Sequence, residues 1–203
     1  RSKSQQLQEV FISASKTKEL RKRIAEQVAF MSIKEIQKKA PQTSADMLAE
    51  IPGIKVQKSQ MGGGSPVLRG MEANRVLLVV DGVRMNNAIY RKGHLQNSIT
   101  VSPNMLDRTE VIFGPSSVVY GSDALGGVIH YYTRKPMLSD KFNSNSSILS
   151  RYSSVNNEIT SQVGVEMSFK KFASYTSVSY SKFGDLKMGK NRRHGFDNWG
   201  KVF

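Results

Sequence analysis

Hydrophobic and polar residues follow two different patterns along this chain. Up to Pro136, short apolar runs are separated by glycines and prolines, and two stretches with apolar residues three or four positions apart predict short helices. Ser32 and Glu35 have the spacing of a capping box, and Thr43 or Ser44 is a suitable N-cap for the second helix. Strands are predicted at 9–14, 67–69, 75–80, 108–113 and 128–134. These elements predict a small mixed α+β domain.

Several turns punctuate this first region. Asp81-Gly82 lies between an apolar strand and a short return strand, which is a strong signal for a β-hairpin. Ser102-Pro103 predicts a short helix over residues 105–106, and Gly114-Pro115 predicts another that reaches Val119. Residues 57–66 and 86–97 show no clear period, so we expect two polar loops there.

After Pro136 the pattern changes to long strands at 147–153, 159–169 and 172–183. In the second of these, Ile159, Val163 and Val165 alternate with polar residues, which is a period of two. Such strands suit a membrane β-barrel with one face in lipid and the other in a wet interior. They equally suit a soluble antiparallel sheet with one solvated face, so the alternation alone leaves both readings open.

Composition excludes several classes of protein. The 203 residues carry a net charge of +14, but the basic residues are spread along the chain instead of forming one block interleaved with aromatics, which argues against a nucleic-acid partner. The absence of cysteine excludes a disulfide scaffold and a thiolate site. The longest apolar run, residues 76–80, is too short for a membrane helix. The first residues contain no apolar segment, so we expect any signal peptide to be removed or to lie outside this sequence.

Enzymatic chemistry finds little support in the sequence. The three histidines, His94, His130 and His194, are far apart, and no nucleophile, histidine and acid share a recognisable motif. The glycines between Gly114 and Gly127 are not followed by the Lys-Ser or Lys-Thr pair of a phosphate loop. We therefore expect no enzymatic activity, no cofactor and no resident metal.

Four blocks in the same order and spacing resemble the plug domain of TonB-dependent outer-membrane receptors. They are residues 45–56, 67–70, 74–84 and 108–129. The resemblance covers about residues 9–135, and the alternating strands that follow are similar to the start of the family's barrel. It implies a tail at 1–8, a plug at 9–136, and the first three or four strands of an incomplete transmembrane β-barrel at 137–203. Plugged transporters have roughly 22 strands, so these strands alone do not close a barrel.

The resemblance also implies a function and its partners. The family imports scarce nutrients such as siderophores, haem or cobalamin-like metal chelates through the outer membrane of Gram-negative bacteria, with the plug inside the barrel and the N-terminus in the periplasm. A TonB-type energy-transducing protein of the periplasm pulls on a short strand, the TonB box. Here residues 9–14 resemble it, although they could instead be only the first strand of the fold. Its core residues are Val10, Phe11, Ile12, Ser13 and Ala14.

Family members often use buried plug arginines against carboxylates of the barrel wall, a role that suits the permanently charged guanidinium. Arg69, placed in a strand, matches this pattern, and Arg84 and Arg108 are further candidates, but Phe113 occupies the usual position of the second arginine. A soluble binding or adhesion module without transport is the alternative to the importer. The expected substrate-facing residues lie in the two polar loops and are Gln60, Met61, Gly62, Tyr90, Arg91 and His94.

Overall fold

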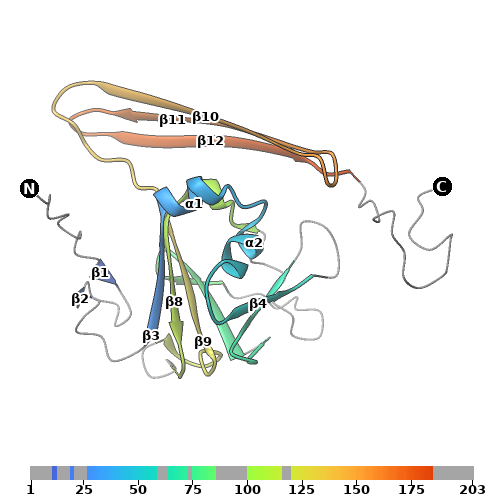
Figure 1. The fold of residues 1–203 in the computed structure, drawn as a ribbon. Helices are drawn as coiled ribbons and strands as arrows, with labels where there is room; N and C mark the ends of the chain where they lie inside the picture. Colours follow the sequence, from blue (N-terminus) through green and yellow to red (C-terminus); the bar gives the residue numbers. More distant parts are fainter. Residues whose placement is uncertain are drawn as a thin grey trace, which may run out of the picture. The chain divides into compact units, whose positions relative to one another are not determined.

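The computed structural model describes residues 11–12, 19–20, 27–58, 64–72, 75–85, 100–115 and 120–184. The chain divides into two compact units, Arg1–Arg134 and Lys135–Phe203, and each is described by itself (Figure 1). Among the described residues, no helix has the length and apolar character needed to cross a membrane.

The first unit is built on a five-stranded mixed sheet with the strand order β3-β8-β9-β6-β7. Strands β6 and β9 are parallel, and the other neighbours are antiparallel. Two further antiparallel pairs, β1-β2 and β4-β5, lie outside this sheet. The elements are β1 (Phe11–Ile12), β2 (Glu19–Leu20), β3 (Gln27–Ser32), α1 (Ile33–Lys39), α2 (Ser44–Ala49), β4 (Ile54–Gln57), β5 (Ser65–Leu68), β6 (Val76–Val80), β7 (Val83–Arg84), the 3-10 turn η5 (Pro103–Met105), β8 (Leu106–Phe113) and β9 (Gly127–Thr133).

Both predicted helices are present, and their caps are those expected from the sequence. The backbone N–H of Ser32 donates to Glu35 Oε2 at 2.7 Å, and the N–H of Glu35 donates to Ser32 Oγ, which completes the capping box of α1. Thr43 caps α2 by accepting a hydrogen bond from the N–H of Asp46 at 3.1 Å. Each helix is short and gains little from propensity alone, so packing against the sheet must stabilise it.

The Asp81-Gly82 hairpin is confirmed. Both residues have positive φ, 48° and 88°, as a type I′ turn requires, and Val80 pairs with Val83 across it. The turn is tied to β9, because the N–H of Gly82 donates to His130 Nε2 at 3.0 Å and Asp81 accepts from the N–H of Thr133 at 3.1 Å. The hairpin is therefore held by the sheet as well as by its own ladder.

The two faces of the five-stranded sheet bury two separate apolar clusters, because alternate residues of a strand point to opposite faces. One face packs against α1 and α2, with Ile36 and Leu48 contributed by the helices and Tyr131 by β9. The opposite face holds a smaller cluster of Val28, Leu77, Val79, Ile112, Tyr120, Ala124 and Val128.

The second unit is a three-stranded antiparallel meander of β10 (Asn143–Ser153), β11 (Glu158–Ser168) and β12 (Ala173–Lys182). Its ladder is continuous from the pair Asn143↔Ser168 to the pair Ser153↔Glu158. The three predicted strands are thus confirmed. Strand β10 begins four residues before its predicted start at Ser147, because its first residues are polar and give no hydrophobic pattern. One face of the meander is polar, and the β11 residues on this face are largely buried. The other face is apolar and exposes Ile148, Tyr152, Ile159, Val163, Val165, Met167, Val178 and Tyr180.

One predicted placement is wrong. Arg69 was expected in a strand, but β5 ends at Leu68, and Arg69 lies in the following turn with a φ of 49°. The backbone turns there because Arg69 and Gly70 both adopt positive φ and the N–H of Met71 donates back to the carbonyl of Leu68 at 2.8 Å. The predicted helix through Val119 and the polar loop at 86–97 lie outside the described residues.

Candidate functional site

A cluster of four polar and aromatic side chains occupies one end of the five-stranded sheet, on the face that carries the smaller apolar cluster. The register pairs Arg108 of β8 with Tyr132 of β9, and Glu110 with His130, so all four point to the same face. Arg108 Nε donates to Glu110 Oε1 at 2.8 Å, and its guanidinium lies 3.7 Å from the centre of the Tyr132 ring. The Tyr132 ring stacks on His130 with a centroid distance of 4.0 Å. We call these residues the Arg108 cluster.

The Arg108 cluster holds a fixed positive charge beside a fully buried carboxylate. Burial by itself lowers the pKa of Arg108, but the hydrogen bond and the charge of Glu110 outweigh burial, and the pKa is raised above its usual value. Arg108 also lies 3.5 Å from Asp107. Arg108 is therefore paired with two carboxylates of its own strand and contributes to the structure of the first unit.

Arg69 has a different environment. It donates a hydrogen bond to the side-chain oxygen of Gln27, and its guanidinium lies 4.9 Å from the centre of the Phe113 ring. The structure thus brings together two residues that were named separately from the sequence. They are Arg69, which matches the family pattern, and Phe113, which occupies the usual position of a second arginine. A cation over an aromatic ring is a favourable contact. Phe113 therefore adds no second positive charge at this position but stabilises the guanidinium of Arg69.

Arg84, at the end of β7, binds the loop that precedes β9. Its Nη2 donates to Asp123 Oδ2 at 2.9 Å and to the carbonyl oxygen of Ser122 at 2.8 Å. Both members of the ion pair are exposed, so the pair adds little stability. Among the described residues, the three predicted arginines have separate partners and do not form one cluster.

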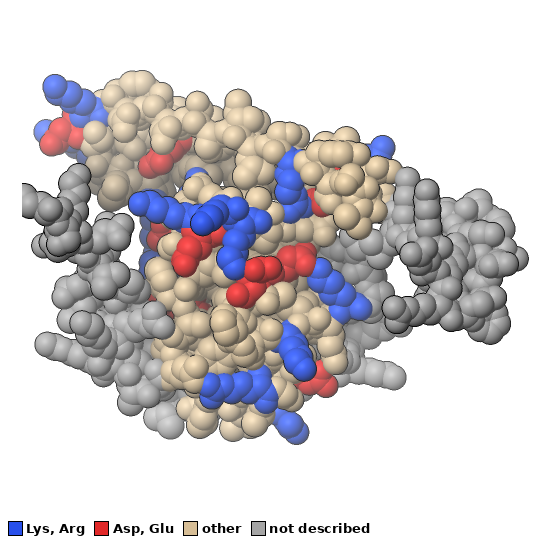
Figure 2. Space-filling view, in the orientation of Figure 1, with Lys and Arg blue, Asp and Glu red and all other residues tan. Residues whose placement is uncertain are grey.

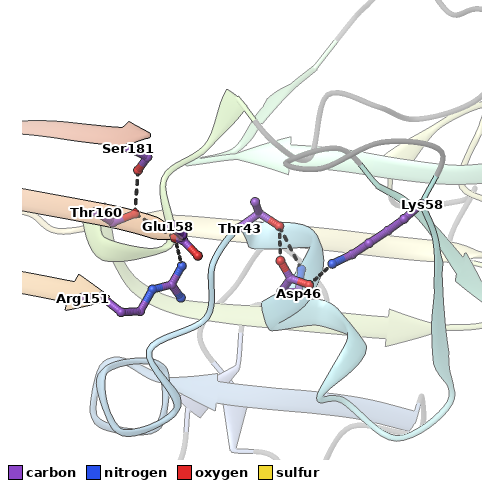
Figure 3. Close-up of polar contacts among 7 residues, drawn as sticks. All are labelled: Thr43, Asp46, Lys58, Arg151, Glu158, Thr160 and Ser181. Atoms are coloured by element: carbon purple, nitrogen blue, oxygen red, sulfur yellow. Dashed lines mark hydrogen bonds and ion pairs between the residues drawn. The ribbon is translucent and has the colours of Figure 1, made fainter. Parts of the chain in front are cut away.

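A second polar network crosses all three strands of the meander (Figure 3). Arg151 of β10 forms an ion pair with Glu158 of β11, a carboxylate that is only 1% exposed. Thr160 Oγ1 donates to Glu158 Oε1 at 2.8 Å and lies 2.9 Å from Ser181 Oγ of β12. These contacts link the three strands through side chains on the polar face of the meander, in addition to the backbone ladder.

A third polar group stabilises the start of α2 (Figure 3). Asp46 accepts a hydrogen bond from Thr43 Oγ1 at 2.8 Å and forms an ion pair with Lys58, the residue after β4. This group ties helix to strand, and its geometry is that of a cap and not of a binding site. Within the described ranges, no three histidine, aspartate or glutamate side chains are grouped so that they could hold a metal ion.

The remaining predicted residues are only partly covered by the structure. Phe11 and Ile12 form β1, which pairs antiparallel with β2 through Phe11↔Leu20 and Ile12↔Glu19. The rest of the TonB-box-like segment, the predicted loop at 86–97 and the predicted substrate-facing residues of the other loop lie outside the described residues, so their roles stay predictions. These residues are Val10, Ser13, Ala14, Gln60, Met61, Gly62, Tyr90, Arg91 and His94. The loop predicted at 57–66 is shorter than expected, because Gln57 ends β4 and Ser65 begins β5.

The Arg108 cluster was not predicted from the sequence as a unit. Arg108 was expected to contact carboxylates of a barrel wall, and His130 was noted only as one of three histidines far apart in sequence. The available signal was polar residues two positions apart in each of two apolar strands, at 108 and 110 and at 130 and 132. That spacing places each pair on one face of its strand, but only the register between the strands shows that the pairs meet.

Comparison with known proteins identifies the family. Residues 21–128, more than half of the chain, match the model of the TonB-dependent Receptor Plug Domain. A hemin receptor of Yersinia pestis is 45% identical over 92 residues, which cover 45% of this chain and 13% of that protein. The vitamin B12 transporter BtuB of Vibrio vulnificus is 37% identical over 128 residues, or 61% of this chain and 20% of that protein. The chain thus spans at most about a fifth of the length of these relatives.

Solved structures agree on the fold. The pyoverdine outer membrane receptor FpvA of Pseudomonas aeruginosa matches with a TM-score of 0.72 at 16% identity, covering 87% of this chain and 25% of that one. The copper transporter OprC matches with a TM-score of 0.68 at 23% identity, covering 79% of this chain and 24% of that one. The first unit makes up only about two thirds of the chain, so both matches extend into the meander. The expected fold, a plug followed by antiparallel wall strands, is confirmed, and the chain belongs to the plug-domain family of TonB-dependent outer-membrane receptors.

Proposed function

We propose that this chain is the plug and the first wall strands of an outer-membrane receptor that gates energised uptake of a scarce nutrient. The observation that carries the proposal is the plug-family match, directly followed by a meander whose apolar face is exposed and whose polar face carries a hydrogen-bonded network across the strands. A sheet of this kind suits lipid on one side and a wet interior on the other. We further propose residues 9–136 as the plug and 137–203 as wall strands, with lipid of the outer membrane as a partner.

The proposed cargo is a metal chelate of the siderophore, haem or cobalamin class. Two relatives are named for hemin and vitamin B12, which are both metal complexes, and the structural neighbours are named for copper and pyoverdine. We assign the receptor no catalytic role and no resident cofactor. Substrate would contact the loops that contain Gln60, Met61, Gly62, Tyr90, Arg91 and His94.

The proposed energy source is a TonB-type protein of the periplasm that binds residues 9–14. The β1-β2 pair supports this role, because a segment that forms an antiparallel ladder has the extended backbone needed to join a partner's sheet edge. Backbone hydrogen bonds dominate such contacts, so the partner would select an extended segment more than particular side chains.

The plug arginines divide into two proposed roles. Arg69 and Arg84 are exposed, and we propose that they contact carboxylates of the wall. Arg108 is partly buried against Glu110, and we propose that it mainly holds β8 and β9 in place, with its remaining exposed part available to the wall.

Deletion of residues 9–14 in the complete receptor tests this function. Energised uptake of the chelate should be lost while binding at the cell surface stays near normal, because the pulled segment is absent but the binding surface is intact. Ile12→Pro should mimic the deletion, since proline removes a backbone donor. Simultaneous loss of binding and uptake would identify the segment as structural, and full uptake by the Ile12→Pro receptor would argue against β-augmentation.

The alternative, a soluble binding module, is distinguished by the requirement for detergent. A soluble module leaves no large apolar sheet face in water, whereas Ile148 and Val178 here are 81% and 70% exposed. Extraction of the full-length gene product from cells decides between the two. Recovery in the soluble fraction without detergent would favour the module.

A further inference from the structure

Three phenylalanine rings gather at one end of the meander, on its apolar face. Phe142 immediately precedes β10, and Phe169 and Phe172 bracket the turn between β11 and β12. The rings of Phe142 and Phe169 lie 4.9 Å apart, and those of Phe169 and Phe172 lie 6.4 Å apart. They are 63%, 41% and 59% exposed.

The turn that carries these rings is well ordered by backbone hydrogen bonds. The N–H of Phe169 donates to the carbonyl of Phe172 at 2.7 Å, and the N–H of Ser139 donates to the carbonyl of Phe169 at 3.2 Å. The second bond attaches the segment before β10 to the turn. Residues from two distant parts of the sequence are thereby fixed at one place.

Lysines flank the same rings. Lys141 precedes Phe142, and Lys170 and Lys171 form the tip of the turn; all three are exposed. Figure 2 shows blue side chains at this end of the meander, at the upper left. Within the described part of the chain, no ion pair includes any of the three, and Asp140 is the one acidic residue of the two segments 137–142 and 169–172. The patch therefore has a net positive charge beside an exposed aromatic surface.

The opposite end of the apolar face carries tyrosines in place of phenylalanines. Tyr152 closes β10, Tyr180 lies near the end of β12, and both are exposed. Phe142 and Tyr152 are ten residues apart in sequence, which corresponds to about 33 Å along a strand. With the usual barrel tilt of about 40°, this length spans a height of about 25 Å, the thickness of the apolar band between two aromatic girdles.

We propose that Lys141, Lys170 and Lys171, together with the three phenylalanines, form a docking site for the phosphate groups of anionic phospholipids. This inference rests on the proposed outer-membrane function. The rings reach the boundary between acyl chains and headgroups, and the lysine ammonium groups lie where the lipid phosphates begin. The site fixes the depth of this part of the wall in the membrane, and the tyrosine end lies at the opposite interface.

The test measures which lipid the complete receptor retains. The detergent-purified receptor is mixed with equal amounts of phosphatidylglycerol and phosphatidylcholine, and retained lipid is counted by native mass spectrometry. We expect a preference for phosphatidylglycerol that falls about tenfold or more when Lys141, Lys170 and Lys171 are all replaced by glutamine, because each lysine near a lipid surface attracts anionic headgroups. Lys182→Gln, on the same face at the tyrosine end, is the matched control and should change the preference less than twofold.

Two further arms keep the result decisive. Replacement of the three lysines by arginine should preserve the preference, and raising the salt concentration to about 1 M should abolish it in the unmodified receptor, because exposed charges are screened. No preference in the unmodified receptor, or an equal loss with Lys182→Gln, would overturn the site. If these lysines retain lipopolysaccharide in place of phosphatidylglycerol, the assignment of an anionic phospholipid as the ligand is wrong. A receptor that needs no detergent at all would instead overturn the proposed function.

Discussion

The sheets of the two units differ in which of their faces are buried. In the plug, apolar strand residues are buried on both faces of the sheet, as Ile129 and Val128 of β9 are. In the meander, Val163 is half exposed on the apolar face while Glu158 is 1% exposed on the polar one. An alternation with a period of two therefore identifies a strand, but it does not show whether the apolar face contacts protein, lipid or water. Which face is buried is known only from the exposure of the side chains in the structure.

Among the residues that the structure describes, each unit buries one carboxylate side chain, and the two are held differently. Glu110 is bound by Arg108, two residues away on the same strand. Glu158 is bound by Arg151 from the neighbouring strand and by Thr160. The Arg108–Glu110 pair connects two residues of one strand. The Arg151–Glu158 pair connects neighbouring strands and so reinforces the backbone hydrogen bonds between β10 and β11.

The largest expected difference between the units is their behaviour in water. Without detergent, residues 1–203 should aggregate, because the apolar face of the meander and its unpaired strand edges are exposed. Residues 1–136 should stay soluble. Analytical sedimentation and amide exchange on both chains measure this. A monodisperse, fully protected monomer of 203 residues without detergent would contradict the membrane assignment of the meander.

Truncating an apolar side chain should matter only in the plug. Leu48→Ala should lower the free energy of unfolding by about 2–5 kcal/mol, because it opens a cavity among fully buried residues. Val163→Ala in detergent should change it by less than about 0.5 kcal/mol, as at other exposed positions. Chemical denaturation of both variants in the same detergent gives the comparison. Equal losses would mean that the apolar face of the meander is packed against protein.

The hairpin turn gives a smaller, purely conformational effect. Gly82→Val should destabilise the plug by about 1–3 kcal/mol, because a β-branched residue is strained at a φ of 88°. Space is not the cause, since nothing lies within 4 Å of where a Cβ would stand. Gly82→Asn is the control and should be much milder, since asparagine tolerates this region. An unchanged melting temperature for Gly82→Val would contradict the turn geometry.

The smallest effect appears only at high pH and again separates the units. Tyr131 is fully buried, and burial raises the pKa of its hydroxyl, an effect that Ser44 offsets only in part. Above pH 10 the hydroxyl ionises in the unfolded chain but not in the fold, so the free energy of unfolding should fall by about 1.4 kcal/mol per pH unit. Below pH 10 this contribution is intact.

Tyr131→Phe should remove the contribution of Tyr131 to that slope and leave the contribution of Tyr120, whose pKa burial also raises, whereas Tyr152→Phe in the exposed face of the meander should leave the slope unchanged. Denaturation at pH 9, 10 and 11 provides the measurement. Identical slopes for the two variants would show that the loss at high pH has another origin.

Local chemistry made much of the fold predictable. The capping box at Ser32, the turn at Asp81-Gly82 and the strands of the meander each depend on residues close together in sequence, and all three are confirmed. Arg69 was misplaced because positive φ at a residue other than glycine has no clear sequence signal. The packing of Arg108 on Tyr132 and of Arg69 on Phe113 depends on strand register and on contacts across 24 and 44 residues of sequence, which local patterns do not encode.

The position of β3 has a mechanical consequence. It is the first strand of the five-stranded sheet in the chain and also one of its two edges, bonded only to β8 within that sheet. Tension applied at the N-terminus therefore reaches β3 before β8, β9 or β6, and detaching it breaks one ladder, whereas extracting β8 would break two. Because Val28 and Met31 of β3 belong to opposite apolar clusters, its departure weakens both faces at once. If force is applied at the N-terminus, we therefore expect the five-stranded sheet to lose β3 first.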